Sequence, residues 1–319
     1  MFLGFLNRMA MGRQDVWSRG VSWSRAADLG DRNLMSKNVI VVGMPRSGTS
    51  LTAGIFPAKG YYIGERSKTF LREGNDHNPF GSFEADDLIA ENVRVLHAAG
   101  FAFHNTWLFE PISSEAIVRI ADTPVLSSHR DFVRAYEQRS PWVWKDPRLC
   151  FTLAYWWRLM DPERTVVVFV RRDPNAIYWS FLRRGWCGPG RAEREAVLGR
   201  IKQHTDAATA AIESLDIPHA VVDHREYLRA PAAVAHRLSV LCDLSISVDD
   251  LNVQSDLDHH SSIRGRISTR LRRGLMRLPR RPIRRLEQLI PRWVLVSLFP
   301  ERRYVEPKPP TGSPDDRQR

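Results

Sequence analysis

Two glycines bracket a short loop of hydroxyl and cationic residues near the start of the chain. Residues 39–51 read VIVVGMPRSGTSL, an apolar run that stops at the loop and restarts as a predicted helix. Gly43 and Gly48 keep the spacing of the pattern G-x-x-x-x-G-K-[ST], whose backbone N–H groups surround phosphate oxygens at a helix N-terminus. We therefore predict an anion-binding site at residues 43–50, named here the phosphate loop.

The phosphate loop lacks the lysine of that pattern. Thr49 stands at the lysine position, and the cation of the loop is Arg46. Because the lysine normally neutralises a transferring γ-phosphate together with a magnesium ion, Thr49 argues against ordinary ATP or GTP hydrolysis. An arginine beside backbone donors at the positive end of a helix dipole still favours an oxyanion. A glycine turn between a strand and a helix, with no ligand, is the alternative.

A second pair of cationic and hydroxyl residues follows another apolar run. Residues 165–170 read TVVVFV and lead into Arg172 and Asp173. Asp173 suits the N-cap of a following helix whose first residue is Pro174. Ser180 lies on roughly the same face of that helix as Asp173, so its hydroxyl is expected to point back towards Arg172. Both pairs follow predicted strands at their carboxyl ends, where parallel sheets bind ligands.

These segments resemble those of sulfotransferases that use PAPS (3′-phosphoadenosine 5′-phosphosulfate). The sequence PRSGTS, residues 45–50, resembles their 5′-phosphosulfate loop, in which a Lys or Arg stands where this chain has Arg46. Arg172 and Ser180 keep the Arg-to-Ser spacing of the element that binds the 3′-phosphate. The resemblance implies a P-loop NTPase-like sulfotransferase fold with PAPS as co-substrate and no metal. It implies these cofactor-binding residues: Arg46, Ser47, Gly48, Thr49, Ser50, Arg172 and Ser180.

The segment between the two phosphate elements extends the resemblance. Residues 142–149 read WVWKDPRL, similar to the Lys-Asp-Pro strand end of bacterial carbohydrate sulfotransferases and tyrosylprotein sulfotransferases. By that resemblance Lys145 approaches the bridging oxygen or the sulfo group, where its charge stabilises the leaving phosphate. An ion pair of Lys145 with Asp146 or with a surface acid is the alternative. Residues 220–231 match the topology of the family, although His224 and Arg225 depart from its sequence pattern.

A general base is also implied, because the acceptor hydroxyl must lose a proton as it attacks sulfur. Glu65 is our first candidate, since it stands at about the place where tyrosylprotein and trehalose sulfotransferases carry a basic glutamate. Glu84 is the second, because it ends an N-P-x-G-x-x-E pattern that recurs in bacterial relatives. Asp146 and His129 follow, and a salt bridge is the alternative role for each acid. The predicted catalytic set is Glu65, Lys145, Arg46 and Glu84.

The elements that must position these residues alternate along the chain. Strands alternating with helices predict an α/β fold, a parallel sheet flanked by helices on both faces. The helix after the phosphate loop is expected to bend or end near Pro57. Residues 61–81, rich in Gly, Asn, Arg and Lys, are expected to form a substrate-facing loop. Strands are predicted at 142–145 and 165–170 besides the one before the phosphate loop, and helices at 83–99, 127–138, 148–160, 174–184 and 191–215.

Composition and cysteine usage exclude several classes of protein. Hydrophobic residues make up 43% and charged residues 26% of the 319 residues, as in ordinary soluble proteins. The three cysteines are widely spaced and no H-E-x-x-H pattern occurs, so neither a disulfide framework nor a metal site is indicated. We divide the chain into a lead-in at residues 1–37, a sulfotransferase domain at 38–305 and a disordered tail at 306–319.

Positive charge concentrates in a basic helical segment, residues 264–303. It holds thirteen arginines against two acids, which equals the whole net charge of +11. With its interleaved leucines it could rest on an anionic membrane surface; a solvated arginine-rich helix is the alternative. By the resemblance, residues 264–266 are a candidate for the late arginine-containing loop that relatives use on the 3′-phosphate. No sequence pattern of a nucleic-acid-binding fold accompanies the charge, so no nucleic acid partner is expected.

The start of the chain and its hydropathy bear on localisation. The apolar N-terminal stretch is interrupted by Asn7 and Arg8 before a secretory apolar region of about seven to fifteen residues is complete. No stretch approaches the roughly twenty apolar residues of a spanning helix. We therefore expect a cytoplasmic protein, peripheral at the inner membrane face if the basic segment binds lipid.

The motifs together predict a sulfotransferase that moves a sulfo group from PAPS to an acceptor hydroxyl. A carbohydrate, glycolipid or secondary metabolite is the preferred acceptor, because ten tryptophans could stack on sugar faces and the tail is basic and apolar. Two alternatives stay open. One is a P-loop kinase or nucleotide phosphotransferase that uses ATP and magnesium. The other is a non-catalytic protein that binds a nucleotide or a membrane surface.

Overall fold

A four-stranded parallel sheet carries the predicted site. The computed structural model describes residues 36–65, 81–101 and 112–252. The strands lie in the order β2-β1-β3-β4, and each neighbouring pair is parallel. Their bounds are β1 Asn38–Val42, β2 Val143–Lys145, β3 Thr165–Arg171 and β4 His219–Asp223.

The order of the strands makes β1 a topological switch point, where the connections of the chain change from one side of the strand to the other. The chain runs from β1 to β2 on one side and then crosses to β3 on the other side of β1. In open α/β sheets, ligands bind in the crevice that such a reversal leaves at the carboxyl ends of the strands. Val41 pairs with Lys145 and Val42 pairs with Phe169, so the ends of β1, β2 and β3 meet at one edge. The phosphate loop leaves from the middle of that edge.

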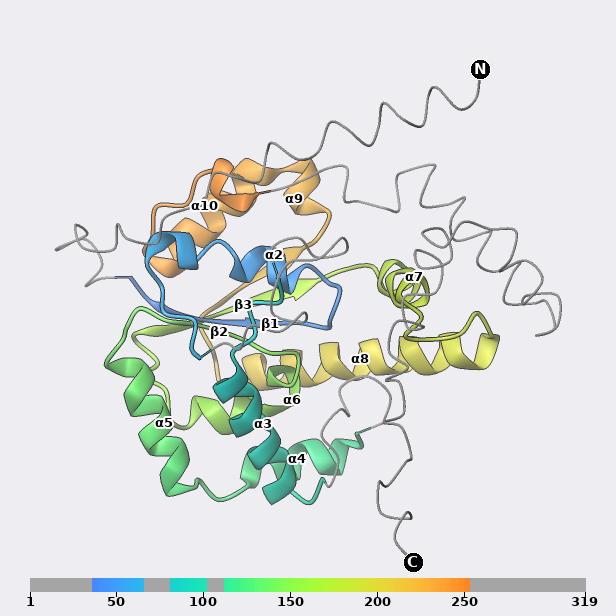
Figure 1. Ribbon diagram of the computed structural model, residues 1–319, viewed down its shortest axis with the longest axis horizontal. Coiled ribbons are helices and arrows are strands. Elements are labelled where there is room, and N and C mark those ends of the chain that lie inside the picture. Colours follow the sequence, from blue (N-terminus) through green and yellow to red (C-terminus); the bar gives the residue numbers. More distant parts are fainter. Residues whose placement is uncertain (1–35, 66–80, 102–111, 253–319) are drawn as a thin grey trace, which may run out of the picture. The chain divides into compact units, whose positions relative to one another are not determined.

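Helices cover both faces of the sheet (Figure 1). Ile40 and Val42 of β1 pack in one apolar cluster with α3, α4, α5, α6 and α8, whereas Val39 and Val41 pack in another with α2 and α10. The helices are α2 Thr49–Ala53, α3 Asp86–Ala98, α4 Ser114–Asp122, α5 Ser127–Glu137, α6 Leu149–Trp157, α7 Pro174–Arg184, α8 Arg191–Ser214, α9 Glu226–Arg229 and α10 Pro231–Cys242, with 3-10 turns at Pro57–Lys59 and Asp249–Leu251.

The expected α/β architecture is therefore confirmed, and several of its boundaries agree closely. Asp173 caps α7 as predicted, because its carboxylate accepts a hydrogen bond from the Ala176 N–H at 2.9 Å. The helix after the phosphate loop ends at Ala53, and Pro57 begins a separate 3-10 turn. The helix expected from residue 83 starts later, at Asp86.

The tryptophans divide in a way that weakens one expectation. Trp142, Trp144 and Trp156 are 0 to 1% exposed and pack against one another in the core. Three of the ten tryptophans are therefore unavailable to stack on a sugar, which removes part of the basis for preferring a carbohydrate acceptor. The choice of acceptor stays a prediction.

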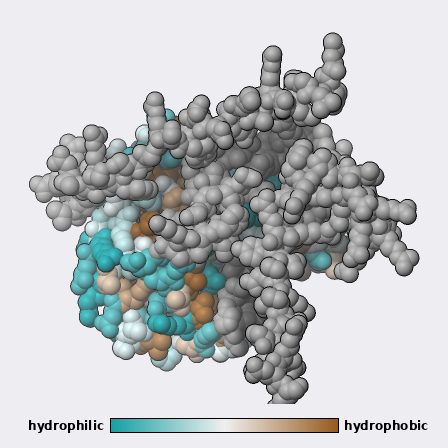
Figure 2. All heavy atoms as spheres, viewed as in Figure 1, coloured by the Kyte–Doolittle hydropathy of each residue, from teal (hydrophilic) through white to brown (hydrophobic). Residues whose placement is uncertain are grey.

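The part of the described surface that is visible in Figure 2 mixes hydrophilic and apolar residues. Figure 2 shows this mixture over the region where α3, α4 and α5 lie in Figure 1. Among the described residues, no helix combines the length and apolar character needed to cross a bilayer. Most of the expected loop at residues 61–81, the basic segment at 264–303 and the tail at 306–319 lie outside the described residues, so those predictions and the domain boundaries stay as stated.

Candidate anion-binding and transfer site

The phosphate loop has backbone angles that require its glycines. Gly43 has a φ of 150°, and a Cβ added there would lie 2.5 Å from the carbonyl oxygen of Val170. Gly48 has a φ of 109°, and its added Cβ would lie 2.9 Å from the Cδ2 atom of His224. Arg46 also adopts a positive φ, of 71°, which is uncommon for a residue with a side chain. The loop is therefore pressed against the ends of β3 and β4.

The two predicted phosphate elements meet. The Nε atom of Arg46 donates to the hydroxyl of Ser180 at 3.1 Å, although the residues are 134 positions apart. Arg172 donates from Nη1 to the backbone oxygen of Arg46, also at 3.1 Å. Two guanidinium groups and a buried serine hydroxyl therefore lie together beside the ends of β1 and β3. The sequence predicted that the Ser180 hydroxyl points towards Arg172, whereas the hydrogen bond recorded for that hydroxyl comes from Arg46. The binding of phosphate groups by these residues stays a prediction.

Like charges crowd this position. Burial first, and then the positive charges of Arg184, Arg172 and Arg183, lower the pKa of Arg46 to about 9. At neutral pH Arg46 therefore still carries its charge, in a place where other cations oppose it. Bringing cations together costs free energy that a bound anion would repay. Sequence reasoning missed Arg183 and Arg184, because basic residues in a last helical turn usually indicate only the helix end.

Other residues of the phosphate loop have more local roles. Ser47 donates to the Met44 carbonyl oxygen from both its N–H, at 3.1 Å, and its hydroxyl, at 2.6 Å. Its predicted contact with the cofactor stays a prediction. Thr49 is buried, and it begins α2. Because α2 has only five residues, its dipole is short, and the arginines must supply most of the attraction for an anion.

A pocket of about 190 Å³ opens beside the loop. Arg172 and Ser47 line it from the sheet edge, Ile177 lines it from α7, and Lys202 lines it from α8. Its walls combine the cations Arg171, Arg172 and Lys202 with apolar side chains, and they also hold Asp206, which forms an ion pair with Lys202. Such a lining suits a ligand that joins an anionic group to an apolar or aromatic one.

On the other side of β1, Lys145 forms an ion pair with Glu84. The Lys145 Nζ atom lies 2.5 Å from a carboxylate oxygen of Glu84, and the side chains are 5% and 19% exposed. Of the two open interpretations of Lys145, pairing with an acid is confirmed, but the acid is the second candidate base rather than Asp146. Two members of the predicted catalytic set therefore lie together at the carboxyl end of β2.

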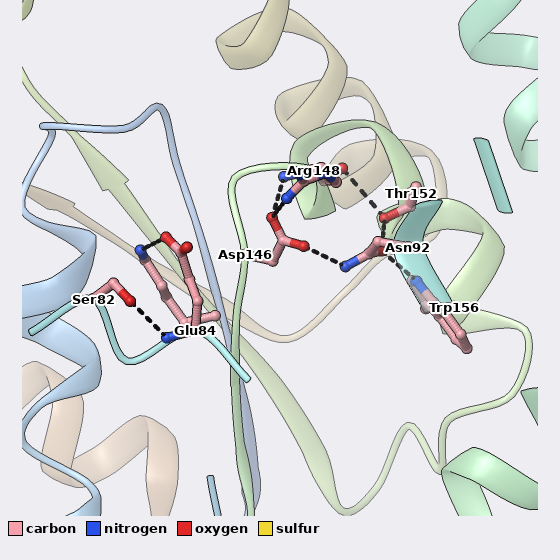
Figure 3. A network of polar contacts seen from close by, with 8 residues as sticks. Ser82, Glu84, Asn92, Asp146, Arg148, Thr152 and Trp156 are labelled. Carbon is pink, nitrogen blue, oxygen red and sulfur yellow. Dashed lines mark hydrogen bonds and ion pairs between the residues drawn. The ribbon is translucent and has the colours of Figure 1, made fainter. Parts of the chain in front are cut away.

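The segment carrying Glu84 is tied to the phosphate loop. Ser50 donates from its hydroxyl to the carbonyl oxygen of Ser82 at 3.2 Å, and the hydroxyl of Ser82 accepts from the Glu84 N–H at 3.5 Å (Figure 3). Between them Phe83 has a φ of 52°, a left-handed conformation that is strained for an aromatic residue. Ser50 thus contacts the segment that carries Glu84.

Glu65 has different neighbours. Its side chain is 75% exposed and lies 3.6 Å from Arg139 Nη1, while one carboxylate oxygen accepts from the Tyr62 hydroxyl at 3.4 Å. Arg139 precedes β2, so these contacts belong to the start of that strand rather than to its carboxyl end. Glu65 stays a prediction, and the recorded contacts favour Glu84 over it.

The two remaining candidate bases have structural partners. Asp146 is 1% exposed and accepts hydrogen bonds from Asn92 and Arg148. His129 is fully buried, with its ring nitrogens 2.5 Å from the Tyr155 hydroxyl and 3.1 Å from the carboxylate of Glu91. Burial lowers the pKa of His129. Neither residue is placed to receive a proton from an external acceptor.

Metal-ligand candidates are absent from the described ranges, where no three or more His, Cys, Asp and Glu residues gather to hold an ion. The expectation of a metal-free reaction stays a prediction. His224, which the sequence marked only as a departure from the family pattern, lies against Gly48. His224 follows β4, and the place of β4 beside β3 brings it next to Gly48. Nothing in the local sequence around His224 indicates this contact.

Comparison with known proteins finds likeness in structure and not in sequence. Neither the protein-family models nor the curated proteins match this chain. Among solved structures, the chain is similar to the sulfotransferase domain from the Synechococcus PCC 7002 olefin synthase, with 13% identity and a TM-score of 0.40. The match covers 69% of this chain and 78% of that one. A likeness of this size adds no argument to the geometry described above.

Proposed function

We propose that this protein is a sulfotransferase that moves a sulfo group from PAPS to an acceptor hydroxyl. The observation that carries the proposal is the meeting of Arg46, Arg172 and Ser180 at the ends of β1 and β3. PAPS presents a 3′-phosphate and a 5′-phosphosulfate, and the resemblance assigns one anion to each of the motifs that meet here. The pocket beside Arg172, with its apolar walls, is consistent with a nucleotide.

The chain's own residues take distinct roles in this reaction. Arg46 and the phosphate loop would hold the 5′-phosphosulfate, and Arg172 with Ser180 would hold the 3′-phosphate. In the transfer, the bond from sulfur to the 5′-phosphate oxygen breaks as the acceptor oxygen bonds to sulfur. Lys145 would offset the charge that grows on the leaving phosphate, because a fixed cation there is worth more in a site that excludes water.

The proton of the acceptor hydroxyl needs a place to go. We assign it to Glu84, because this carboxylate lies next to Lys145 and on a segment bound to Ser50. Glu65 is the alternative base. Turnover of Glu84→Gln and Glu65→Gln decides between them: general-base removal costs about 10²- to 10⁴-fold, and the residue whose variant keeps wild-type turnover is cleared.

A thermal-shift comparison tests the proposal against the kinase alternative. The protein is melted with adenosine 3′,5′-bisphosphate, with ATP plus magnesium, and without ligand. A ligand present at a hundred times its dissociation constant stabilises the native state by roughly 2.7 kcal/mol, so the bisphosphate should raise the melting temperature clearly. A shift with ATP and magnesium alone would contradict the proposal. Transfer of sulfo groups from PAPS to a panel of hydroxyl acceptors then separates an enzyme from a binding protein.

A further inference from the structure

We infer that Asn92 and Asp146 are positioning residues for the Lys145–Glu84 pair, an inference that rests on the proposed function. Neither residue reaches the surface, since Asn92 is 0% and Asp146 1% exposed. Asp146 directly follows Lys145 at the end of β2. Asn92 lies in α3, the helix that begins two residues after Glu84. The two buried residues thus belong to the same two chain segments as the reactive pair.

The carboxylate of Asp146 is held by three hydrogen bonds. One oxygen accepts from the backbone N–H and from Nη1 of Arg148, each at 3.0 Å. The other oxygen accepts from Nδ2 of Asn92, also at 3.0 Å (Figure 3). The turn after β2 therefore has a fixed shape, and that shape sets the direction in which the Lys145 side chain leaves the strand.

The orientation of the Asn92 amide is fixed by residues of α6. Its oxygen accepts from the Trp156 Nε1 atom at 2.8 Å and from the Thr152 hydroxyl at 2.6 Å. Because an indole nitrogen only donates, the oxygen of Asn92 must face Trp156. The amide nitrogen consequently faces Asp146, as Figure 3 shows. The network has one consistent arrangement of donors and acceptors.

Two bridges therefore join α3 and its leading segment to the end of β2. The outer bridge is Lys145 with Glu84, and the inner bridge is Asp146 with Asn92. A shift of α3 along β2 would break both. Burying charged and amide groups is costly, and apolar residues of similar volume often stabilise a core as well or better. The inner bridge is thus better explained by the geometry it imposes on the outer one than by stability.

Three variants test this inference, with Asn92→Ala as the primary change. Val95→Ala is the matched control, because Val95 lies one turn along the same helix, is fully buried and belongs to the apolar cluster. The double variant Thr152→Val with Trp156→Phe removes both donors to the Asn92 oxygen; valine matches the shape of threonine, and phenylalanine keeps an aromatic ring smaller than the indole. It serves if Asn92→Ala fails to fold.

The kinetic readout separates positioning from stability. Misplacing reacting groups by about 1 Å can cost 10²-fold in rate, so we expect kcat to fall about 10- to 100-fold in Asn92→Ala. The dissociation constant of adenosine 3′,5′-bisphosphate should stay near the wild-type value, the pH profile of kcat should change, and Val95→Ala should retain wild-type kcat. Equal losses of kcat in the two alanine variants would overturn the inference.

A second readout does not depend on sulfo transfer. Lys145 is nearly buried and paired, so an acylating reagent should label it slowly in the wild-type protein. Quantitative mass spectrometry should find faster labelling of Lys145 in Asn92→Ala and in the double variant, but not in Val95→Ala. Equal labelling in all proteins would overturn the inference. If wild-type protein transfers no sulfo group yet the labelling differs as expected, the proposed function fails and the positioning role stands.

Discussion

The two sides of β1 handle charge in opposite ways. Beside β3, Arg46 is half-buried near Arg172 and two further arginines, and desolvation first and then their charges lower its pKa. Beside β2, Lys145 is matched by Glu84, and Asp146 is matched by Arg148. Crowded like charges favour an added anion, whereas matched charges favour a fixed geometry. Under the proposed function, the side next to β3 is the binding side, which holds the phosphates of the donor, and the side next to β2 is the transfer side, which holds the reacting groups.

The largest effect is expected for Lys145, which tests whether residues next to β2 affect turnover without affecting cofactor affinity. Lys145→Ala should lower turnover about 10²- to 10³-fold, the cost of removing one group that stabilises developing charge. Affinity for adenosine 3′,5′-bisphosphate, measured by calorimetry, should remain close to that of the wild-type protein. Lys37→Ala is the control, because Lys37 precedes β1 at the opposite end of the sheet and pairs with Asp243 at 3.7 Å. If Lys145→Ala lowers the affinity for the bisphosphate as much as it lowers turnover, Lys145 does not act on transfer alone and the prediction is wrong.

A change in Arg172 tests the opposite expectation for the residues next to β3, which should affect cofactor affinity. Arg172→Ala should weaken bisphosphate binding about 10- to 150-fold, because hydrogen bonds to a charged group contribute about 1.5–3 kcal/mol each. Arg134→Ala removes the same charge from an exposed site on α5, where its side chain is 70% exposed, and should leave the affinity unchanged. If both arginine variants weaken binding equally, the bisphosphate responds to net charge and not to this site.

The loop between the two sides is tested through stability. Gly43→Ala should lower the free energy of unfolding by about 1–3 kcal/mol, the typical cost of holding a residue in a strained backbone region. The clash with the Val170 carbonyl, at 2.5 Å, adds to that cost. Gly199→Ala should instead stabilise by about 0.4–1 kcal/mol, because Gly199 lies in α8 and an added Cβ meets nothing within 4 Å. Urea unfolding measures both, and a neutral Gly43→Ala would mean that the loop can relax.

The smallest effect is expected for His204, a buried residue of α8, on the pH dependence of stability. Burial lowers the pKa of His204 to about 3, against 6.5 in the unfolded chain. Between about pH 3 and pH 6.5 the unfolded chain therefore binds a proton at His204 that the folded protein does not bind. The contribution of His204 to the free energy of unfolding is present above pH 6.5 and is lost as the pH falls below it. His204 should contribute a loss of about 1.4 kcal/mol between pH 7.5 and pH 5.5. A smaller pH dependence of urea unfolding in His204→Gln supports this, and an unchanged one contradicts it.

Much of the fold could be predicted because its signals are local. The apolar run at residues 165–170 coincides with β3, and Asp-Pro after it marks the start of α7. Helix α4 was not predicted, because a nine-residue amphipathic helix gives a short pattern. Phe83 also escaped prediction, since nothing in its type indicates a left-handed backbone.

In the candidate site too, local features could be predicted from the sequence, and contacts between distant residues could not. Arg46 and Arg172 could be selected because each follows a strand. Ser180 could be selected because it lies about two helical turns after Asp173, on the same face of α7. The partner of Lys145 could not be deduced, because Glu84 approaches from a segment 61 positions away. The network of Asn92 was invisible in the sequence, since a buried asparagine in a helix resembles any polar surface residue until its neighbours are known.

The place of β1 in the sheet also bears on how the protein assembles. The contacts of Arg46 with Ser180 and of Arg172 with Arg46 join residues 134 and 126 positions apart. Such distant pairings form slowly, because a long stretch of chain must be ordered before they contribute. On the ribosome, the phosphate loop emerges long before the strand that completes its surroundings. The pairing of β1 with β3 must therefore await synthesis of all the residues between these two strands.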